Sequence, residues 1–305
     1  MRERLEVRGP AKLNLALSVG GPDDAKMHPI SGWMATVDLF DDLELVRLPV
    51  GQPSRYAVIW HEEARRTSDI DWSISKDLTY CAHRALEQAV GRGLSVQAKL
   101  EKRIPVGGGL GGGSSDAAAM LHGINTLFKL GLSTEELAEI SAPLGSDIPF
   151  LVHGGAAVVG GLGERIDAVE PPSELNVVLV FPPTSCPTGP VYGRLDEIRP
   201  TAEVADDLVR SMATEPLQAE ALFNDLGPAA FELHPQLLED RDRVSAIAGL
   251  PVHLSGSGST LFVLASGPLE ADLLAQAIED QTGLPAVPAK ACPGVELGEI
   301  QRPLG

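Results

Sequence analysis

A run of glycines restricts the fold of this chain more than any other feature. Six glycines lie within seven residues from Gly107 to Gly113, and only Leu110 interrupts them. Glycine costs backbone entropy and is used where the chain needs positive φ or where another group approaches the main chain closely. A flexible linker would have unpatterned polar flanks, but here an alternating apolar segment, 94–100, precedes the run and an apolar pattern with helical spacing, 117–128, follows it. The order of strand, glycine loop and helix predicts a phosphate-binding loop, because free N–H groups and the helix dipole both attract anions.

The composition excludes several classes of function. The chain has 305 residues, of which 44% are apolar, so a large core and two domains are expected. A net charge of −18 argues against a broad nucleic-acid-binding surface, although local positive groups could still bind a nucleotide. Cys81, Cys186 and Cys292 lack the spacing of a zinc site or a disulfide framework. Because the sequence has no signal-peptide core and no run of roughly 18 to 20 apolar residues, we expect a cytoplasmic protein that binds no membrane.

Strand and helix patterns alternate along both halves of the chain, which predicts α+β or α/β layers, and the α+β fold is the one implied by the family resemblance given below. The expected strands cover residues 11–19, 33–40, 42–48, 56–60, 155–160, 175–181 and 285–291. The expected helices run from Asp77 to Val90, from a capping box at Ser133, within parts of 203–247 and from Leu269 to Gln281. Segment 251–264 is expected to form a strand, a glycine turn and a second strand. LGSDIPF is expected to be a loop, and 182–190 an irregular connection.

Three common nucleotide-binding loops do not fit the glycine run. Gly107, Gly109 and Gly112 match the spacing GxGxxG, but the acidic residue that a dinucleotide-binding fold needs about 20 residues later would fall in an expected helix. A Walker A loop ends in Gly-Lys followed by Ser or Thr, whereas this run ends in Gly-Ser-Ser and contains no lysine. The VAIK, HRD and DFG sequences of protein kinases are absent from the chain.

The segment PVGGGLGGGSS resembles the second motif of the GHMP kinase superfamily. PAKLNLAL near the N-terminus resembles the first motif and HLSGSGSTLFVL the third, in the order of that superfamily. Together with LGSDIPFLVHGGAAVVGGLGE, these motifs are most similar to the 4-diphosphocytidyl-2-C-methyl-D-erythritol kinases of non-mevalonate isoprenoid synthesis. The resemblance implies a two-domain fold, with ATP between an N-terminal ATP-binding domain, 1–160, and a C-terminal domain, 161–305. It also implies phosphoryl transfer from ATP, with Mg²⁺, to the 2-hydroxyl of a small alcohol that carries cytidine diphosphate.

The same resemblance assigns residues to an ATP site. The glycine loop would surround the triphosphate through main-chain N–H groups, with the third motif supporting it. The hydroxyls of Ser114 and Ser115 would either cap the helix or contact phosphate or Mg²⁺, whereas Asp116 fits a first-turn residue favoured by the helix dipole. The metal ligands stay unassigned. The predicted ATP-binding residues are Asp77, Leu78, Lys102, Pro105, Gly107, Gly108, Gly109, Leu110, Gly111, Gly112, Gly113, Ser114 and Ser115, and the third motif contributes Gly256, Ser257 and Gly258.

A carboxylate and a lysine are expected to carry the chemistry. A carboxylate near a hydroxyl nucleophile can take its proton. On local sequence alone, Asp147 fits this role and an Asx turn equally well, and the resemblance aligns it with the catalytic aspartate of the family. Lys12 lies in an alternating strand, where a solvent-facing lysine is the commoner case. The resemblance places Lys12 beside the aspartate, where its charge would stabilise the transferred phosphoryl group.

The acceptor site is predicted from the resemblance alone. Asn14 would hydrogen-bond the acceptor, His28 would contact the edge of its cytosine, and Thr188 would contact the substrate. Tyr192 would stack on the cytosine, because an aromatic face can stack on any base. The family usually has Gly-Tyr-His where this chain has KMH, so Met27 would replace the second aromatic face.

Two other functions stay open at this stage. One is a GHMP-type kinase for another small alcohol or sugar, and the other is a GHMP-like nucleotide-binding protein without turnover. Met27, in place of the usual aromatic residue, is compatible with a kinase for another acceptor. The presence of both Lys12 and Asp147 argues against a protein without turnover. Either a monomer or a homodimer is compatible with the sequence.

Overall fold

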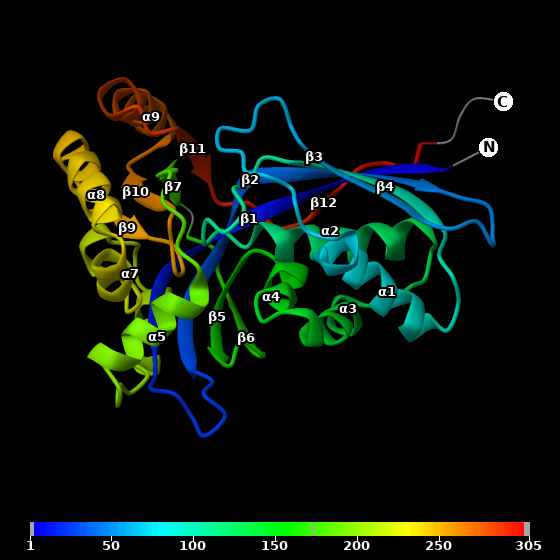
Figure 1. The fold of residues 1–305 in the computed structure, drawn as a ribbon, viewed down its shortest axis with the longest axis horizontal. Coiled ribbons are helices and arrows are strands. Elements are labelled where there is room, and N and C mark those ends of the chain that lie inside the picture. Colours follow the sequence, from blue (N-terminus) through cyan, green and yellow to red (C-terminus); the bar gives the residue numbers. More distant parts are fainter. Residues whose placement is uncertain (1–2, 173, 302–305) are drawn as a thin grey trace.

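The computed structural model describes residues 3–172 and 174–301, shown as a ribbon in Figure 1. The strands are β1 (Arg4–Val19), β2 (Ile30–Arg47), β3 (Arg55–Trp60), β4 (Val96–Lys102), β5 (Ala156–Gly161), β6 (Arg165–Val169), β7 (Asn176–Val180), β8 (Phe223–Asn224), β9 (His253–Leu254), β10 (Leu261–Ala265), β11 (Ala286–Lys290) and β12 (Glu296–Leu297). The helices are α1 (Leu78–Val90), α2 (Gly112–Leu127), α3 (Thr134–Ser141), α4 (Ile148–His153), α5 (Thr188–Ile198), α6 (Asp206–Thr214), α7 (Gly227–Leu233), α8 (Pro235–Ala248) and α9 (Pro268–Thr282). Within these described ranges, no helix has both the length and the apolar character that a membrane span requires.

The larger of two sheets is built on the long antiparallel pair of β1 and β2. Its strands follow the order β12-β1-β2-β4-β3, with β5 pairing with β2 and β6, and β8 pairing with β1. The main pairing runs from Arg4 opposite Val46 to Val19 opposite Ile30. Pro10 lies at a shift of this register, where its missing N–H is tolerated. Helices α1 to α4 lie along one side of this sheet in Figure 1, and their apolar side chains form a core with it.

The smaller sheet has the order β11-β7-β10-β9 and is antiparallel. Helix α9 packs on β11 and β7, and α8 lies beside α9 (Figure 1). Leu13 of β1 belongs to one buried cluster together with Phe181 and Phe262 from the part of the chain that carries the smaller sheet. The first strand therefore contributes to both halves of the molecule, and its side chains lie at the junction between them.

The strongest patterns in the sequence form the expected elements. Helix α1 starts after Asp77, whose carboxylate accepts a hydrogen bond from the N–H of Thr79, and the capping box at Ser133 is formed. The expected strands 33–40 and 42–48 are one continuous strand, β2. Asp41 does not interrupt it because this carboxylate is buried and accepts hydrogen bonds from the end of β4 and the residues after it.

Two segments expected to be irregular are partly helical. LGSDIPF was expected to be a loop, but α4 begins at Ile148, directly after Asp147. Pro149 is compatible with this helix because the first helical turn needs no N–H donor. In the same way, α5 begins at Thr188, inside the expected irregular segment 182–190. Prolines near both helix starts made these segments look like connections.

The proposed division of the chain at residue 160 stays a prediction. Strand β6 lies after this residue but pairs with β5 in the larger sheet. The smaller sheet starts with β7, but β8 and β12, which come later in the chain, both pair with β1 in the larger sheet. Sheet membership therefore changes several times after residue 160 and does not follow a single division of the chain.

Candidate active site

A cavity of about 730 Å³ lies where the glycine loop meets β1 and the segment that leads into α5. The start of α1, the residues before α4 and the glycine turn between β9 and β10 also line it. These segments are far apart in the sequence and belong to both halves of the fold. The cavity is large enough for a drug-sized ligand, for which pockets of about 300 to 1,000 Å³ are usual.

The glycine loop has the backbone that its composition predicts. Gly107, Gly109 and Gly111 all have positive φ, at 68°, 77° and 67°. Gly111 is the N-cap of α2, so the N–H groups at the start of this helix have no intrahelical acceptors. A Cβ at Gly109 would collide with the carbonyl oxygen of Ser255, and a Cβ at Gly111 would lie 2.9 Å from Cγ of Lys12. The loop therefore needs glycine both for its conformation and for close contact with its neighbours.

The glycine turn of the third motif holds the loop from the other side. The hydroxyl of Ser255 donates to the carbonyl of Gly109 at 3.0 Å, and the N–H of Thr260 donates to the carbonyl of Gly108 at 3.1 Å. Gly256 of the turn has a φ of 56°. These contacts join two glycine segments from the two halves of the chain into one rigid wall of the cavity.

Lys12, Asn14 and Asp147 meet beside the glycine loop. The Lys12 ammonium donates to Oδ1 of Asn14 at 2.5 Å and lies 3.5 Å from Oδ2 of Asp147. Lys12 is only 5% exposed, and its N–H donates to the carbonyl of Leu110 in the loop at 2.9 Å. Asp147 is the residue before α4, and its carboxylate does not cap that helix. An unused carboxylate beside a buried ammonium can bind a hydroxyl group, whose proton it can accept.

Lys102 is held by two carboxylates at the edge of the same cavity. Its ammonium donates to Asp41 at 2.5 Å and also to Asp116 in the first part of α2. Burial by itself lowers the pKa of Lys102, but the two carboxylates more than offset burial and raise this pKa above its ordinary value. Lys102 is thus a charged group fixed by protein contacts, and Asp116, interpreted from the sequence as a first-turn helix residue, is one of its partners.

The start of α1 forms another wall of the cavity. The carboxylate of Asp77 accepts hydrogen bonds from the N–H of Thr79 at 2.9 Å and from the indole of Trp72 at 3.0 Å. Asp77 therefore shapes this wall through its cap, and Trp72, Lys76 and Leu78 line the cavity around it. A flat aromatic surface beside a phosphate-type loop is a suitable environment for a nucleobase.

The start of α5 supplies the opposite wall. Thr188 and Tyr192 both line the cavity, and the hydroxyl of Thr188 lies 3.2 Å from that of Ser257. Burial and the charge of Asp147 raise the pKa of Tyr192 to about 12. The aromatic ring of Tyr192 gives this wall a surface on which a base can stack.

Met27 and His28, both predicted to contact the acceptor, lie outside the cavity lining. The ring of His28 packs on Tyr192 with 4.8 Å between the centroids, and its Nε2 is 2.7 Å from Oδ1 of Asp196. Met27 is 49% exposed. Neither residue lines the cavity in this structure, so the predicted cytosine sandwich of Met27 and Tyr192 stays a prediction.

Comparison with known proteins shows the family to which the chain belongs. The family described as "GHMP kinases N terminal domain" matches residues 77–155. A 4-diphosphocytidyl-2-C-methyl-D-erythritol kinase from Bacillus cytotoxicus is 36% identical over 263 residues, which are 86% of this chain and 88% of the relative. The chain belongs to this family of GHMP kinases.

Solved structures of GHMP kinases have the same fold. A crystal structure of 4-(cytidine 5'-diphospho)-2C-methyl-D-erythritol kinase is similar with a TM-score of 0.74 and 31% identity, and the match covers 97% of this chain and 99% of that one. The homoserine kinase from Cytophaga hutchinsonii has a TM-score of 0.71 at 17% identity, covering 96% of this chain and 97% of that one, and shows the fold alone.

Most residues that the sequence predicts for a GHMP kinase site line this cavity. Those in the lining are Lys12, Asn14, Asp77, Leu78, Lys102, Pro105, Gly107, Gly108, Gly109, Gly111, Gly112, Gly113, Ser114, Asp147, Thr188, Tyr192, Gly256 and Ser257. Those outside it are Met27, His28, Leu110, Ser115 and Gly258. Ser115 is fully buried beneath the loop, which leaves Ser114 as the serine that faces the cavity.

The sequence interpretation missed several residues of the cavity. Trp72 and Lys76 lie just before Asp77, and Met34, Ser185 and Cys186 come from other segments. Trp72 had a detectable signal, because tryptophan is rare in this chain and this one lies a short distance before the helix start predicted at Asp77. The other four have no local pattern that separates them from ordinary strand or loop residues.

Proposed function

We propose that this chain transfers the γ-phosphoryl group of ATP to the 2-hydroxyl of 4-diphosphocytidyl-2-C-methyl-D-erythritol. The observation that carries the proposal is the Lys12–Asp147 pair at 3.5 Å, which lies against the glycine loop inside the large cavity. The names and identities of the relatives support the same reaction. In this arrangement, a hydroxyl held by Asp147 would face a phosphate held by the loop.

The residues of the chain would contribute positioning and charge. N–H groups of Gly112, Gly113 and Ser114 at the start of α2 would donate to phosphate oxygens, in place of a Walker lysine. Asp147 would accept the proton of the acceptor hydroxyl, and Lys12 would stabilise the charge on the transferred group. Such electrostatic positioning accounts for most of the catalysis in phosphoryl transfer.

Mg²⁺ would bind between the loop and the phosphates. In the described part of the chain, no cluster of three or more His, Cys, Asp or Glu side chains forms a metal cage. Mg²⁺ in kinases is usually held by one or two carboxylates together with phosphate oxygens and water, so a cage is not needed. Asp116 fits this requirement because it lines the cavity and its Oδ1 is buried without a hydrogen-bond partner. Ser114, at the cavity surface, is the second candidate, and the ion would neutralise charge on the phosphates.

The acceptor subsite would lie between Asp147 and the start of α5. Asn14, Thr188 and Tyr192 would contact the acceptor, and the ring of Tyr192 would stack on its cytosine. His28 would either act through Tyr192, on which it packs, or turn toward the cytosine when the acceptor binds. The exposure of Met27 is the observation that favours the second candidate function, a GHMP kinase for another small alcohol.

A turnover assay with several acceptors tests the proposal. The purified protein would be incubated with ATP, Mg²⁺ and, in separate reactions, the cytidyl erythritol, homoserine, mevalonate or galactose, and ADP formation would be followed. We expect turnover with the cytidyl erythritol and a phosphate on its 2-hydroxyl by phosphorus NMR. Turnover with another alcohol alone would establish the second candidate, and ATP binding without any turnover would refute a kinase.

A further inference from the structure

One segment crosses from the larger sheet to the second half of the molecule. Residues 61–73, here called the crossing segment, connect β3 to the turn before α1. The segment begins beside β4, where the N–H of His61 donates to the carbonyl of Lys102 at 2.9 Å. Further along, the Arg65 guanidinium forms an ion pair with Glu279 of α9. In Figure 1 this part of the chain rises above the sheet near β11.

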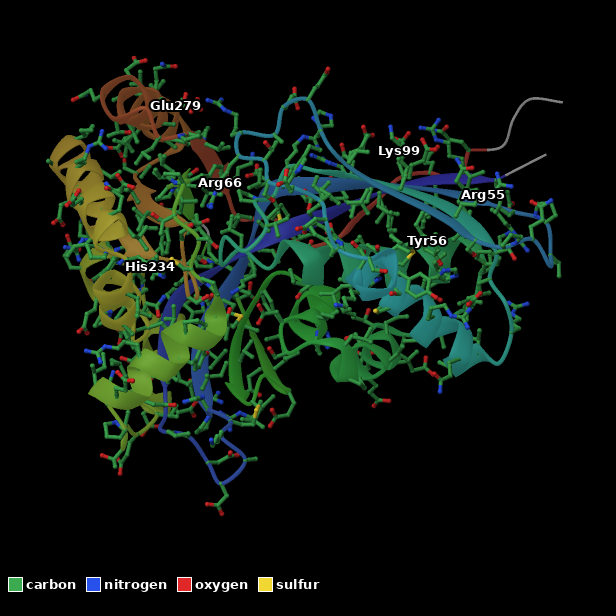
Figure 2. The ribbon with its side chains drawn as sticks, in the orientation of Figure 1. Arg55, Tyr56, Arg66, Lys99, His234 and Glu279 are labelled. Atoms are coloured by element: carbon green, nitrogen blue, oxygen red, sulfur yellow. The ribbon has the colours of Figure 1, made fainter. Side chains whose placement is uncertain are left out.

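Arg66 makes the central contacts of the crossing segment. Its Nη1 donates to the hydroxyl of Ser259 at 3.0 Å, and its Nη2 donates to the carbonyls of Thr184 at 3.0 Å and Pro183 at 3.4 Å. Burial lowers the pKa of Arg66 from its ordinary value, although the group remains a cation at neutral pH. Figure 2 shows Arg66 near the second half of the molecule, whereas Arg55, from the strand before the segment, lies at the opposite end of the larger sheet.

The partners of Arg66 come from two segments, and each segment adjoins a different wall of the cavity. Ser259 follows the glycine turn that supports the phosphate loop. Thr184 and Pro183 precede residues 185–188, which form the wall at the start of α5. Near its end, the crossing segment contains Trp72, whose indole donates to Asp77 on the wall assigned to the nucleobase. Arg66 does not line the cavity, so any effect it has on a ligand passes through these walls.

We propose that Arg66 is a positioning residue that couples the nucleotide subsite to the acceptor subsite. This inference rests on the proposed function, because it takes the cavity to bind both substrates. A planar guanidinium with donors in a fixed fork can hold three oxygens from two segments at once, which a lysine cannot do. A nucleotide that packs on Trp72 contacts the end of the crossing segment, and Arg66 connects this segment to the glycine turn and to the residues before α5, which adjoin the acceptor subsite. Such coupling between two sites is reciprocal.

Binding measurements on the full chain test this coupling. Calorimetry would give the affinity for β,γ-imido-ATP with Mg²⁺, first alone and then with saturating cytidyl erythritol, a pair that cannot react. For the wild type we expect the acceptor to tighten the nucleotide by at least about fivefold, the lower end of typical coupling. We call the nucleotide dissociation constant without acceptor, divided by that with acceptor, the coupling ratio. For Arg66→Gln and Arg66→Lys we expect this ratio to fall below about twofold. Arg55→Gln is the matched control, since it removes an exposed arginine of the preceding strand, and its ratio should equal that of the wild type.

A second variant and a stability measurement separate coupling from a simple structural role. Ser259→Ala removes one acceptor of Arg66 without touching its charge, and it should reduce the ratio in part even if the Arg66 variants fail to fold. A fall in melting temperature with an unchanged ratio would overturn the inference, as would a wild-type ratio below twofold. If the wild type binds no nucleotide or no acceptor, the proposed function itself is wrong.

Discussion

The Nζ of Lys12 lies 3.5 Å from Oδ2 of Asp147, although the two residues are 135 positions apart and come from a strand and the start of a helix. The ammonium of Lys12 also donates to Asn14, and the backbone N–H of Lys12 donates to the carbonyl of Leu110 in the glycine loop. One residue therefore contacts the carboxylate, the amide and the phosphate-type loop. Loss of its charge should affect the contacts with Asp147 and Asn14, whereas the backbone contact with the loop should remain.

Removal of the carboxylate charge should abolish most turnover. Asp147→Asn keeps the size of the side chain but cannot accept the acceptor proton, so we expect kcat to fall by about 10² to 10⁴-fold. ATP binding by calorimetry should stay within a few-fold of wild type. Lys12→Met should give a similar fall, and the double variant should lose less than the product of the two, because both groups act on one transition state. A kcat within a few-fold of wild type for Asp147→Asn would exclude it from the mechanism.

Two alanine substitutions in the glycine loop should separate the effect of backbone strain on ATP affinity from the effect of a steric collision. A Cβ at Gly109 would collide with the carbonyl of Ser255, whereas a Cβ at Gly107 would meet nothing within 4 Å, and both residues have positive φ. Gly109→Ala should therefore displace the loop and weaken ATP binding at least about tenfold. Gly107→Ala carries the cost of positive φ alone, about 1 kcal/mol for a non-glycine residue, and serves as the control. Equal ATP affinities for the two variants would show that the wall formed by Ser255 does not position the loop.

Local pattern was sufficient to predict the loop, the helix α1 and the capping box at Ser133, because each depends on residues close together in the sequence. It could not predict that Ser255 binds the carbonyl of Gly109, since 146 positions separate them. The pairing of Lys102 with Asp41 has the same origin, because antiparallel β2 and β4 bring these side chains together only after the sheet forms.

Loss of the aromatic ring of Tyr192 should weaken binding of the acceptor and leave binding of the nucleotide unchanged. Base–aromatic stacking is worth about 1–3 kcal/mol per base when removed by alanine substitution. Tyr192→Ala should therefore weaken acceptor binding by roughly tenfold or more, while Tyr192→Phe keeps the ring and should stay close to wild type. Met27→Tyr should be neutral or tighten the acceptor if this side chain reaches the cytosine in the complex. Unchanged acceptor affinity in Tyr192→Ala would assign the stacking role elsewhere.

Tyr56, which is partly buried, and the buried His83 form a pair outside the cavity lining. The Tyr56 hydroxyl is 2.5 Å from Nδ1 of His83, whose Nε2 is 2.9 Å from the carbonyl of Leu94. Tyr56→Phe leaves Nδ1 without its partner, and a buried unsatisfied group costs about 1–3 kcal/mol. We expect this loss in the free energy of unfolding by urea titration, with kcat unchanged. Tyr80→Phe, whose ring packs on Tyr56 at 5.2 Å, should cost less. A neutral Tyr56→Phe would mean that water replaces the lost hydroxyl.

The buried histidines should make the protein less stable in mild acid, with His253 as the clearest case. Burial lowers the pKa of His253 to about 4, and its Nε2 is buried without a hydrogen-bond partner. The unfolded chain binds a proton at this side chain near its ordinary pKa of about 6.5, whereas the folded chain does not until about pH 4. The stabilising contribution is therefore complete above about pH 6.5 and is lost as the pH falls toward 4, by up to about 3 kcal/mol at 1.36 kcal/mol per unit. Burial also lowers the pKa of His83 and of His122, so their effects on stability have the same sign.

Urea titrations at several pH values should show a shallower decline in the free energy of unfolding with falling pH for His253→Gln than for the wild type, with the exposed His153→Gln as the control. Parallel curves for His253→Gln and the wild type would show that another group causes the decline.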